Sequence, residues 1–476
     1  MSRKNGGIIG PANTPVGGLF KGVAGGVWRM NDVANFVSNS QWPTGPQSID
    51  NSLRFDDGSS TYLSKTFSSA GNRKTWTWSA WIKRSTLSTN QVLFSAGTAA
   101  SHLRIYDDDK IGIGISGQGN FKSSGVLRDT SAWYHVLYSV DTTLGSNRVT
   151  LYINGSVFLQ TDAGYSLNDD TLFNNNIQHY IAHDTETSSW YFDGYMAEVV
   201  FVDGQALDQT SFGEFDTTTG IWKPKKIGSF TSAGTNSFYL DFKDSSNVGK
   251  DASGLSNNFT VNNLTSIDQS TDTCVENFAT LNPLHYESRD NTFSEGNLKI
   301  TGGGSDGWTN HYGISSIAVS AGKWFVETKV TTTQTSQAIL GILSTSQAIN
   351  SSLKDIGRAT VEKSGTITVF GSNAQTGLTA FSNGDIAGIS FDATNGTAQF
   401  YRNGSAYGSA ISSIPSDTYY FATTTYDSGG VVEFNFGNPP YSISSGNSDA
   451  NGHGNFEYSV PSGYFALCSK NLAEFG

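Results

Sequence analysis

Short runs of β-branched and aromatic residues, each closed by glycine, asparagine or aspartate, recur along most of the chain. Residues 111–115 alternate isoleucine with glycine, and residues 149–153 lead directly into Asn154 and Gly155. Strict alternation places every second side chain on one face of a strand, and an Asn-Gly pair supplies the positive φ angles of a two-residue hairpin turn. Strands of this kind, spaced roughly 8–15 residues apart, predict an antiparallel β-sandwich.

Two such series follow one another, so the sequence predicts an all-β fold with two sandwiches. Residues 51–221 form the first series and residues 292–476 the second, which includes a C-terminal tail. Both contain the pattern Tyr-x-Asn-Gly, at residues 152–155 and 401–404. Residues 222–291 carry fewer strand patterns and more Asn, Ser and Asp, and they predict a loop-rich connector that packs on its neighbours.

Charge and hydropathy exclude several classes of partner. The chain has 41 acidic and 29 basic side chains, a net charge of −12, and no basic cluster. Since nucleic-acid binding depends on clustered Lys and Arg, we expect no nucleic-acid partner. The best apolar run, residues 196–202, is far below the roughly 20 residues that span a bilayer, so we expect no membrane insertion. The N-terminus lacks the roughly 7–15-residue apolar core of a signal peptide, so we expect no secretion by that route.

Residues 1–50 predict an extended N-terminal arm. This segment is rich in glycine and shows neither a strand nor a helix period, so it cannot bury a core of its own. Its apolar side chains are useless in a free tail, which favours docking on another protein or subunit; a disordered leader is the alternative. The candidate attachment residues are Ile8, Ile9, Phe20, Val27 and Trp28.

Several motifs resemble known β-sandwich families. The first series resembles the laminin G-like or pentraxin-like branch of the concanavalin A-like jelly rolls, and the second resembles a SPRY domain, which shares the same two-sheet fold. The resemblance therefore implies two concanavalin A-like jelly rolls. The first likeness rests on residues 78–83, 133–136, 149–155 and 191–199, and the second on residues 322–327, 384–388, 400–404 and 432–437.

The remaining segments resemble virion proteins of tailed phages, particularly marine and cyanobacterial ones. This likeness implies a virion protein made in the host cytoplasm, with the arm bound to other virion proteins and the sandwiches displayed. It implies a tail fibre or tail-associated adhesin that contacts a host surface glycan or receptor, with a capsid decoration or head-fibre protein as the alternative. By analogy we expect a homo-oligomer, a trimer. The segments are residues 7–11, 26–30, 278–283 and 463–468.

The sequence predicts no catalytic residues and no cofactor. Glycosidases with a concanavalin A-like fold set two carboxylates close together along one strand. Here the residue two positions after Glu198 is Val200, and the residue two positions after Glu327 is Lys329, so neither strand carries a second carboxylate at the comparable position. We therefore expect a protein that is not an enzyme, and a polysaccharide depolymerase is a less favoured alternative.

The resemblance also implies two kinds of ligand site on the first sandwich. Laminin G-like and pentraxin-like relatives often hold calcium in loops at one rim, so Asp184 and Asp193 are the calcium candidates; solvated turn carboxylates are the favoured alternative. Tyr106 and Trp190 are the candidates for stacking on a sugar ring. Both rings also suit a core or a subunit contact.

Overall fold

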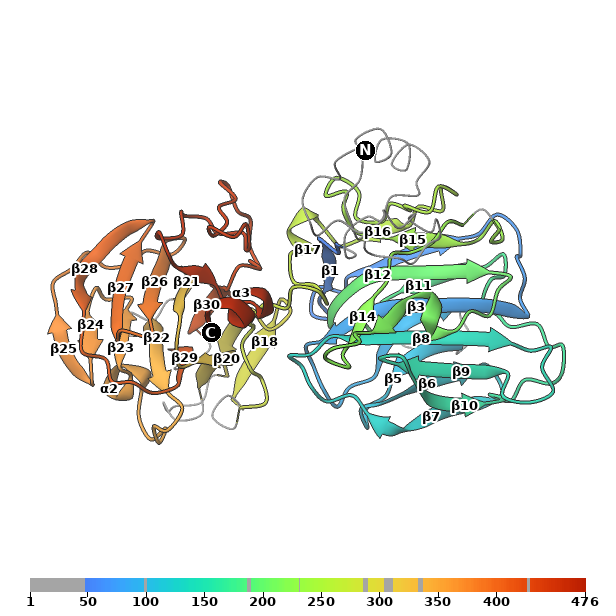
Figure 1. The fold of residues 1–476 in the computed structure, drawn as a ribbon, viewed down its shortest axis with the longest axis horizontal. Coiled ribbons are helices and arrows are strands. Elements are labelled where there is room, and N and C mark those ends of the chain that lie inside the picture. Colours follow the sequence, from blue (N-terminus) through green and yellow to red (C-terminus); the bar gives the residue numbers. More distant parts are fainter. Residues whose placement is uncertain are drawn as a thin grey trace, which may run out of the picture.

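The computed structural model describes residues 48–97, 101–185, 190–230, 232–285, 290–303, 311–332, 337–425 and 429–476. Across these residues the chain is all-β, and two sandwiches lie side by side, as the sequence predicts (Figure 1). The five candidate attachment residues of the arm lie outside the described residues. In the described part of the chain, no helix is long and apolar enough to cross a membrane.

The first sandwich is built from two sheets, which we call sheet I and sheet II. Sheet I has the order β10-β9-β8-β3-β12-β1-β17, and β15 also pairs with β12. Trp76, Trp78 and Ala80 alternate along β3 and face the core between the sheets. The strands are β1 (Ser52–Phe55), β3 (Thr75–Arg84), β8 (Tyr134–Asp141), β9 (Val149–Ile153), β10 (Ser156–Thr161), β12 (Gly194–Asp203), β15 (Phe238–Leu240) and β17 (Gln269–Ser270).

Sheet II has the order β16-β2-β11-β4-β5-β6-β7. Leu103 and Ile105 on β5 and the isoleucines of β6 face the core, since alternate side chains of a strand share a face. The chain reverses between β5 and β6 at the acidic turn 107–109. The strands are β2 (Tyr62–Thr66), β4 (Gln91–Ala96), β5 (Ser101–Ile105), β6 (Lys110–Ile115), β7 (Gly119–Val126), β11 (Gln178–Ile181) and β16 (Thr260–Asn262).

The segment 222–291, predicted to be a connector, contributes to both sheets of the first sandwich. It supplies β15 and β17 to sheet I and β16 to sheet II. These strands are only two or three residues long, so their sequences carry little periodic signal. The region also contains β14 (Trp222–Pro224), which forms a short hairpin with the preceding β13 (Gly213–Phe215), and the 3-10 turn η2 (Ser266–Asp268); a further 3-10 turn, η1 (Gln209–Ser211), precedes β13.

The second sandwich is also built from two sheets. Sheet III has the order β18-β19-β30-β21-β26-β27-β28, with β31 paired to β21, and sheet IV has the order β20-β29-β22-β23-β24-β25. Sheet III contains β18 (Asn291–Ser294), β19 (Lys299–Gly302), β21 (Lys323–Val330), β26 (Ile386–Asp392), β27 (Thr397–Arg402), β28 (Ser405–Ile411), β30 (Val431–Asn435) and β31 (Phe465–Ala466). Sheet IV contains β20 (Tyr312–Val319), β22 (Ala338–Ser344), β23 (Ala359–Glu362), β24 (Ile367–Val369), β25 (Ser372–Gln375) and β29 (Tyr419–Thr424). Two short helices of the described residues also belong to this half of the chain, α2 (Leu353–Ile356) and α3 (Ser469–Phe475).

The two Tyr-x-Asn-Gly motifs form equivalent hairpin turns in the two sandwiches. Asn154 and Gly155 have φ angles of 47° and 76°, and Asn403 and Gly404 have φ angles of 48° and 76°. Each asparagine also accepts a hydrogen bond from a backbone N–H of the neighbouring strand, at 2.8 Å from His135 and at 2.9 Å from Ile386. The predicted two-residue turns are therefore confirmed.

Candidate functional site

Segments of the chain itself cover the outer faces of three sheets. On sheet I, Phe212 packs against Leu137 and Val200. On sheet III, Phe456 from the C-terminal segment packs on Phe325, and on sheet IV the covering element is α2. Among the described residues, no buried apolar cluster covers the outer face of sheet II. Within the described part of the chain, sheet II therefore lacks the apolar cover of the other three sheets, although the outward side chains of β5 are only 2–4% exposed.

Strand alternation decides which side chains sheet II presents on its outer face. Because Leu103 and Ile105 face the core, His102 and Arg104 lie on the outer face of β5. On β6 the isoleucines point inward, so Gly112 and Gly114 occupy the outer positions. The outer face is thus polar on β5 and carries no side-chain bulk at two positions of the next strand.

The guanidinium of Arg104 lies between two aromatic rings. Its central carbon is 4.0 Å from the ring centre of Tyr106 and 4.0 Å from that of Trp190. A planar cation over an aromatic face is attracted by the ring quadrupole, and Arg is well suited to this stacking. The ammonium of Lys122 also lies 4.3 Å from the centre of the Tyr106 ring. These contacts hold the Arg104 side chain in one orientation.

His102 forms the other wall of this group. Its Nδ1 lies 2.9 Å from Asp184 Oδ2, and its ring meets Trp190 edge-on with centres 5.7 Å apart. The imidazole rests over Gly114, where a Cβ atom would come within 2.2 Å of His102 Nε2. Any residue larger than glycine at position 114 would therefore displace the His102 ring.

These residues surround an open pocket of about 210 Å³, which we call the Arg104 pocket. Its walls combine an aromatic ring from Trp190, the guanidinium of Arg104 and the amide of Asn120, which accepts a hydrogen bond from the hydroxyl of Tyr106 at 3.2 Å. A ring face together with planar hydrogen-bonding groups suits a ligand that has both C–H surfaces and hydroxyls. The lining residues are His102, Arg104, Ile115, Gly117, Gly119, Asn120 and Trp190.

A second group of rings adjoins the pocket on the same outer face. His183 and Tyr191 stack with centres 4.2 Å apart and planes 9° apart. Tyr62 on β2 lies 4.8 Å from His183 and 6.0 Å from Tyr180 on β11. Tyr191 follows Trp190 in the sequence, so this group is linked to the wall of the Arg104 pocket through neighbouring residues.

The structure separates the roles of the predicted glycan contacts. Trp190 is half-buried and lines the pocket. Tyr106 is only 1% exposed, and burial raises the pKa of its hydroxyl to about 12. Its ring therefore supports Arg104 from within the protein. Sequence reasoning did not find His102, Arg104 or Asn120, although the alternation at residues 102–105 and 111–115 indicates the outward positions of β5 and β6.

The two calcium candidates lie in different surroundings. Asp184 is buried and faces His102. Asp193 is buried beside Asp56 and Asp57, and these three carboxylates can each place one oxygen within 4.8 Å of the others. Burial, together with the charges of Asp57 and Asp56, raises the pKa of Asp193 to about 8.

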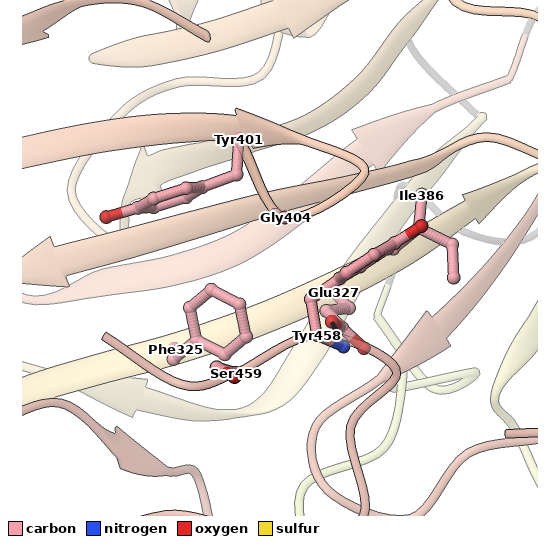
Figure 2. A pocket seen from close by; sticks show the side chains of 8 residues that line it. Phe325, Glu327, Ile386, Tyr401, Gly404, Tyr458 and Ser459 are labelled. Atoms are coloured by element: carbon pink, nitrogen blue, oxygen red, sulfur yellow. Dashed lines mark hydrogen bonds between the residues drawn. The ribbon is translucent and has the colours of Figure 1, made fainter. Parts of the chain in front are cut away.

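The two carboxylates weighed for hydrolysis both hold parts of the chain in place. Glu198 accepts hydrogen bonds from the hydroxyl of Tyr239 at 2.7 and 2.8 Å. Glu327 accepts backbone N–H groups from Glu457 at 3.0 Å and Tyr458 at 2.9 Å. Figure 2 shows Glu327 beside the Tyr458 ring, at a cavity of only about 10 Å³, which is room for roughly one water molecule.

Comparison with protein families concerns the first sandwich. Residues 57–211 match the laminin G model of the concanavalin A-like lectin and glucanase superfamily. The first sandwich has the concanavalin A-like fold. The match begins in the turn after β1 and ends within η1, so it includes the Arg104 pocket but leaves out the later strands β15, β16 and β17. No curated protein matches the chain significantly.

Solved structures resemble parts of the chain in fold. A candidate carbohydrate-binding protein from Bacteroides ovatus is 21% identical, with a TM-score of 0.34, over 46% of this chain and 61% of that one, so this chain spans less than two thirds of its length. The SPRY domain of human HERC1 is 19% identical, with a TM-score of 0.25, over 29% of this chain and 87% of that one. A heptameric SAP-like pentraxin from Limulus polyphemus is 14% identical, with a TM-score of 0.27, over 34% of this chain and 79% of that one.

Proposed function

We propose that this chain is a carbohydrate-binding protein without catalytic activity, and that the Arg104 pocket holds the sugar. The observation that carries this proposal is the open pocket of about 210 Å³ on the only sheet face that no buried apolar cluster of the described chain covers. The match of residues 57–211 to a lectin and glucanase superfamily supports it.

The geometry suggests how a sugar would bind. The Trp190 ring would pack on the C–H face of a pyranose, while Arg104 and Asn120 would hydrogen-bond its hydroxyls. The volume suits roughly one monosaccharide ring, and the pocket is open, so we expect recognition of a chain end or of one unit of a longer glycan. Tyr106 and Asp184 would act by positioning Arg104 and His102.

The direct test is glycan binding by the full chain and by Trp190→Ala. We expect a roughly five- to thirtyfold loss of affinity for the best glycan found on an array, because stacking on an aromatic ring contributes about 1–2 kcal/mol. Phe370→Ala is the matched control, since Phe370 is an exposed ring on the second sandwich. Unchanged binding by Trp190→Ala would contradict the pocket, and release of reducing sugar from the bound glycan would contradict the absence of catalysis.

We further propose that the protein is displayed on a tailed-phage particle, as a tail fibre or tail-associated adhesin that contacts the host surface. Support comes from the resemblance of residues 7–30, 278–283 and 463–468 to virion proteins. Immunogold labelling of intact particles tests this proposal: gold along the tail supports it, regular gold on the capsid favours the decoration alternative, and unlabelled particles contradict both. The proposed trimer is tested by the mass of the full chain in solution, where a monomer would contradict it.

A further inference from the structure

One buried lysine of the first sandwich contacts a carboxylate and a side-chain amide at the same time. Lys83, near the end of β3, places Nζ 2.8 Å from Asp272 Oδ2 and 2.8 Å from Asn277 Oδ1. A third contact, to the Phe278 carbonyl at 3.2 Å, helps to hold the amine in place. The fold therefore brings an amine and an amide together that lie 194 residues apart in the sequence, with an acid beside them.

These three groups are shielded from water. Lys83 is 1% exposed and Asp272 is 0% exposed, whereas Asn277 is half-buried. Lys83 Nζ lies 5.7 Å from the centre of the buried Tyr195 ring, and the Trp133 indole donates to Asp272 Oδ1 at 3.0 Å. In surroundings of low polarity, a neutral amine and a neutral carboxylic acid avoid the cost of two desolvated charges.

Proton transfer inside this ion pair turns Lys83 into a nucleophile. Asp272 Oδ2 is within hydrogen-bond distance of Nζ, so it can accept one ammonium proton and leave a neutral amine with a free electron pair. The carbon to be attacked, Asn277 Cγ, is only one bond length, about 1.2 Å, from the Oδ1 atom that Nζ already contacts. Asn277 Nδ2 donates to the Ser131 carbonyl at 2.8 Å, which fixes the orientation of the amide. Such fixed proximity replaces an encounter between separate molecules.

We propose that Lys83 and Asn277 form an intramolecular isopeptide bond, with Asp272 as the catalytic acid and base. A Cγ–Nζ bond forms and the Cγ–Nδ2 bond breaks. Nζ gives up two protons: one remains on Asp272, and the other passes through Asp272 to the leaving nitrogen, which departs as ammonia. The reaction consumes no oxidant, reductant or other reactant. The ion pair of Lys83 and Asp272 is the state before the reaction.

A second lysine makes the same contact without the other two conditions. Lys363 Nζ lies 2.8 Å from Asn383 Oδ1, and its other partner is the Thr332 carbonyl. Asn383 is exposed, and in the described part of the chain no carboxylate forms an ion pair with Lys363. Since water solvates this pair and no acid takes up the proton, we expect no bond between Lys363 and Asn383.

The bond would fasten the two sandwiches to each other. Lys83 belongs to sheet I, and Asn277 lies in the segment between β17 and the second sandwich. A cross-link between residues so far apart in the sequence restricts the unfolded chain, and this stabilises the folded one. The reaction does not involve the Arg104 pocket, so it is independent of sugar binding.

The test is mass spectrometry of the full chain, denatured after purification and after prolonged incubation. We expect the wild type to be lighter than its sequence by one ammonia molecule, and a protease digest to contain one branched peptide that joins the segments around Lys83 and Asn277. Asn277→Ala keeps the Lys83–Asp272 pair, so it should fold, and it should show neither change. Asn383→Ala is the matched control, because it removes the same 2.8 Å contact at the surface, and it should react as the wild type does.

Two further variants test the roles of the amine and the acid. Lys83→Arg keeps a cation beside Asp272 but has no nucleophilic amine, so it should fold and keep its full mass. Asp272→Asn, compared with the wild type at equal folded fraction by circular dichroism, should lose ammonia at least a hundredfold more slowly, because acid–base catalysis typically contributes about 10²–10⁴-fold.

Each outcome supports or overturns a part of the proposal. A wild type that keeps its full mass after incubation overturns it. Loss of ammonia without the branched peptide also overturns it, because an Asn-Gly pair can lose ammonia by cyclising on its own backbone. A branched peptide at Lys83 in Asn277→Ala overturns the choice of Asn277, and an unchanged rate in Asp272→Asn overturns the role of Asp272.

Discussion

At the scale of single residues, His135 is a buried imidazole with both nitrogens engaged. Nε2 lies 2.9 Å from Ser79 Oγ, and Nδ1 accepts the indole N–H of Trp222 at 3.2 Å. An Nδ1 that accepts a hydrogen bond carries no proton, so the ring is neutral in the folded protein. Burial lowers the pKa of His135 from 6.5 to about 3.

The depressed pKa of His135 predicts acid sensitivity. Below pH 6.5 the His135 imidazole is protonated in the unfolded chain but stays neutral in the folded chain. The free energy of unfolding therefore decreases as the pH falls from 6.5 toward 3. A shift of this size corresponds to about 5 kcal/mol of unfolding free energy once the pH is below both pKa values. Urea unfolding at several pH values should show His135→Gln with a shallower pH dependence than the wild type between pH 7 and pH 4. Parallel profiles of the two proteins would contradict the prediction.

At the scale of elements, β6 carries two functions on its two faces. Its isoleucines complete the core, while Gly114 on the outer face leaves room for the His102 ring. Glycine is required at position 114 because the His102 ring lies so close to it. The backbone conformation does not require glycine, since Gly114 does not have a positive φ angle. An added methyl group would push the imidazole away from Asp184.

We therefore predict that Gly114→Ala damages the Arg104 pocket. The displaced His102 ring should lower glycan affinity at least tenfold, and the overpacked contact should cost about 1–3 kcal/mol of stability. Gly145→Ala is the control: no atom lies within 4 Å of its added Cβ, so its stability should stay within about 0.5 kcal/mol of the wild type. Binding curves and urea unfolding measure both effects, and a Gly114→Ala protein that binds glycan normally would show that the His102 position does not matter.

At the scale of the whole molecule, a buried polar network joins the sandwiches. Lys83 Nζ lies 2.8 Å from Asp272 Oδ2 and donates to the Phe278 carbonyl at 3.2 Å. The indole of Trp133 donates to Asp272 Oδ1 at 3.0 Å. Lys83 and Asp272 are 1% and 0% exposed, so neither charge can be hydrated if its partner is removed.

Breaking this network should be costly. Lys83→Met leaves Asp272 buried without its cation, and we expect a loss of about 3–5 kcal/mol in unfolding free energy. Lys250→Met is the matched control, because Lys250 forms a 2.9 Å ion pair with Asp244 on the surface, and its loss should leave the unfolding free energy nearly unchanged. Denaturant unfolding compares the two, and Asp272→Asn added to Lys83→Met should restore part of the loss. Similar small losses for both lysine variants would contradict a structural role for the Lys83 pair.

Features that depend only on neighbouring residues could be predicted from the amino-acid sequence. The Asn-Gly turns at residues 154–155 and 403–404, the hairpin around residues 107–109 and the inward face of Trp76 were predictable, because turn geometry and strand alternation are local properties. The all-β fold with two sandwiches follows from the repetition of such local patterns. Trp190 was likewise identified as a candidate from its type and its place near a loop.

Contacts between residues that are distant in the sequence could not be predicted in this way and became visible in the folded molecule. The register of β1 on β12 brings Asp56 to Asp193, and the approach of Trp190 to β5 places Arg104 between the rings of Trp190 and Tyr106. The short strands of residues 222–291 belong to the first sandwich because they pair with the edges of its sheets and with the central strand β12. Their own sequences are too short to indicate these pairings. Burial and pairing across long sequence separations depend on the whole packed molecule, and no local pattern carries that information.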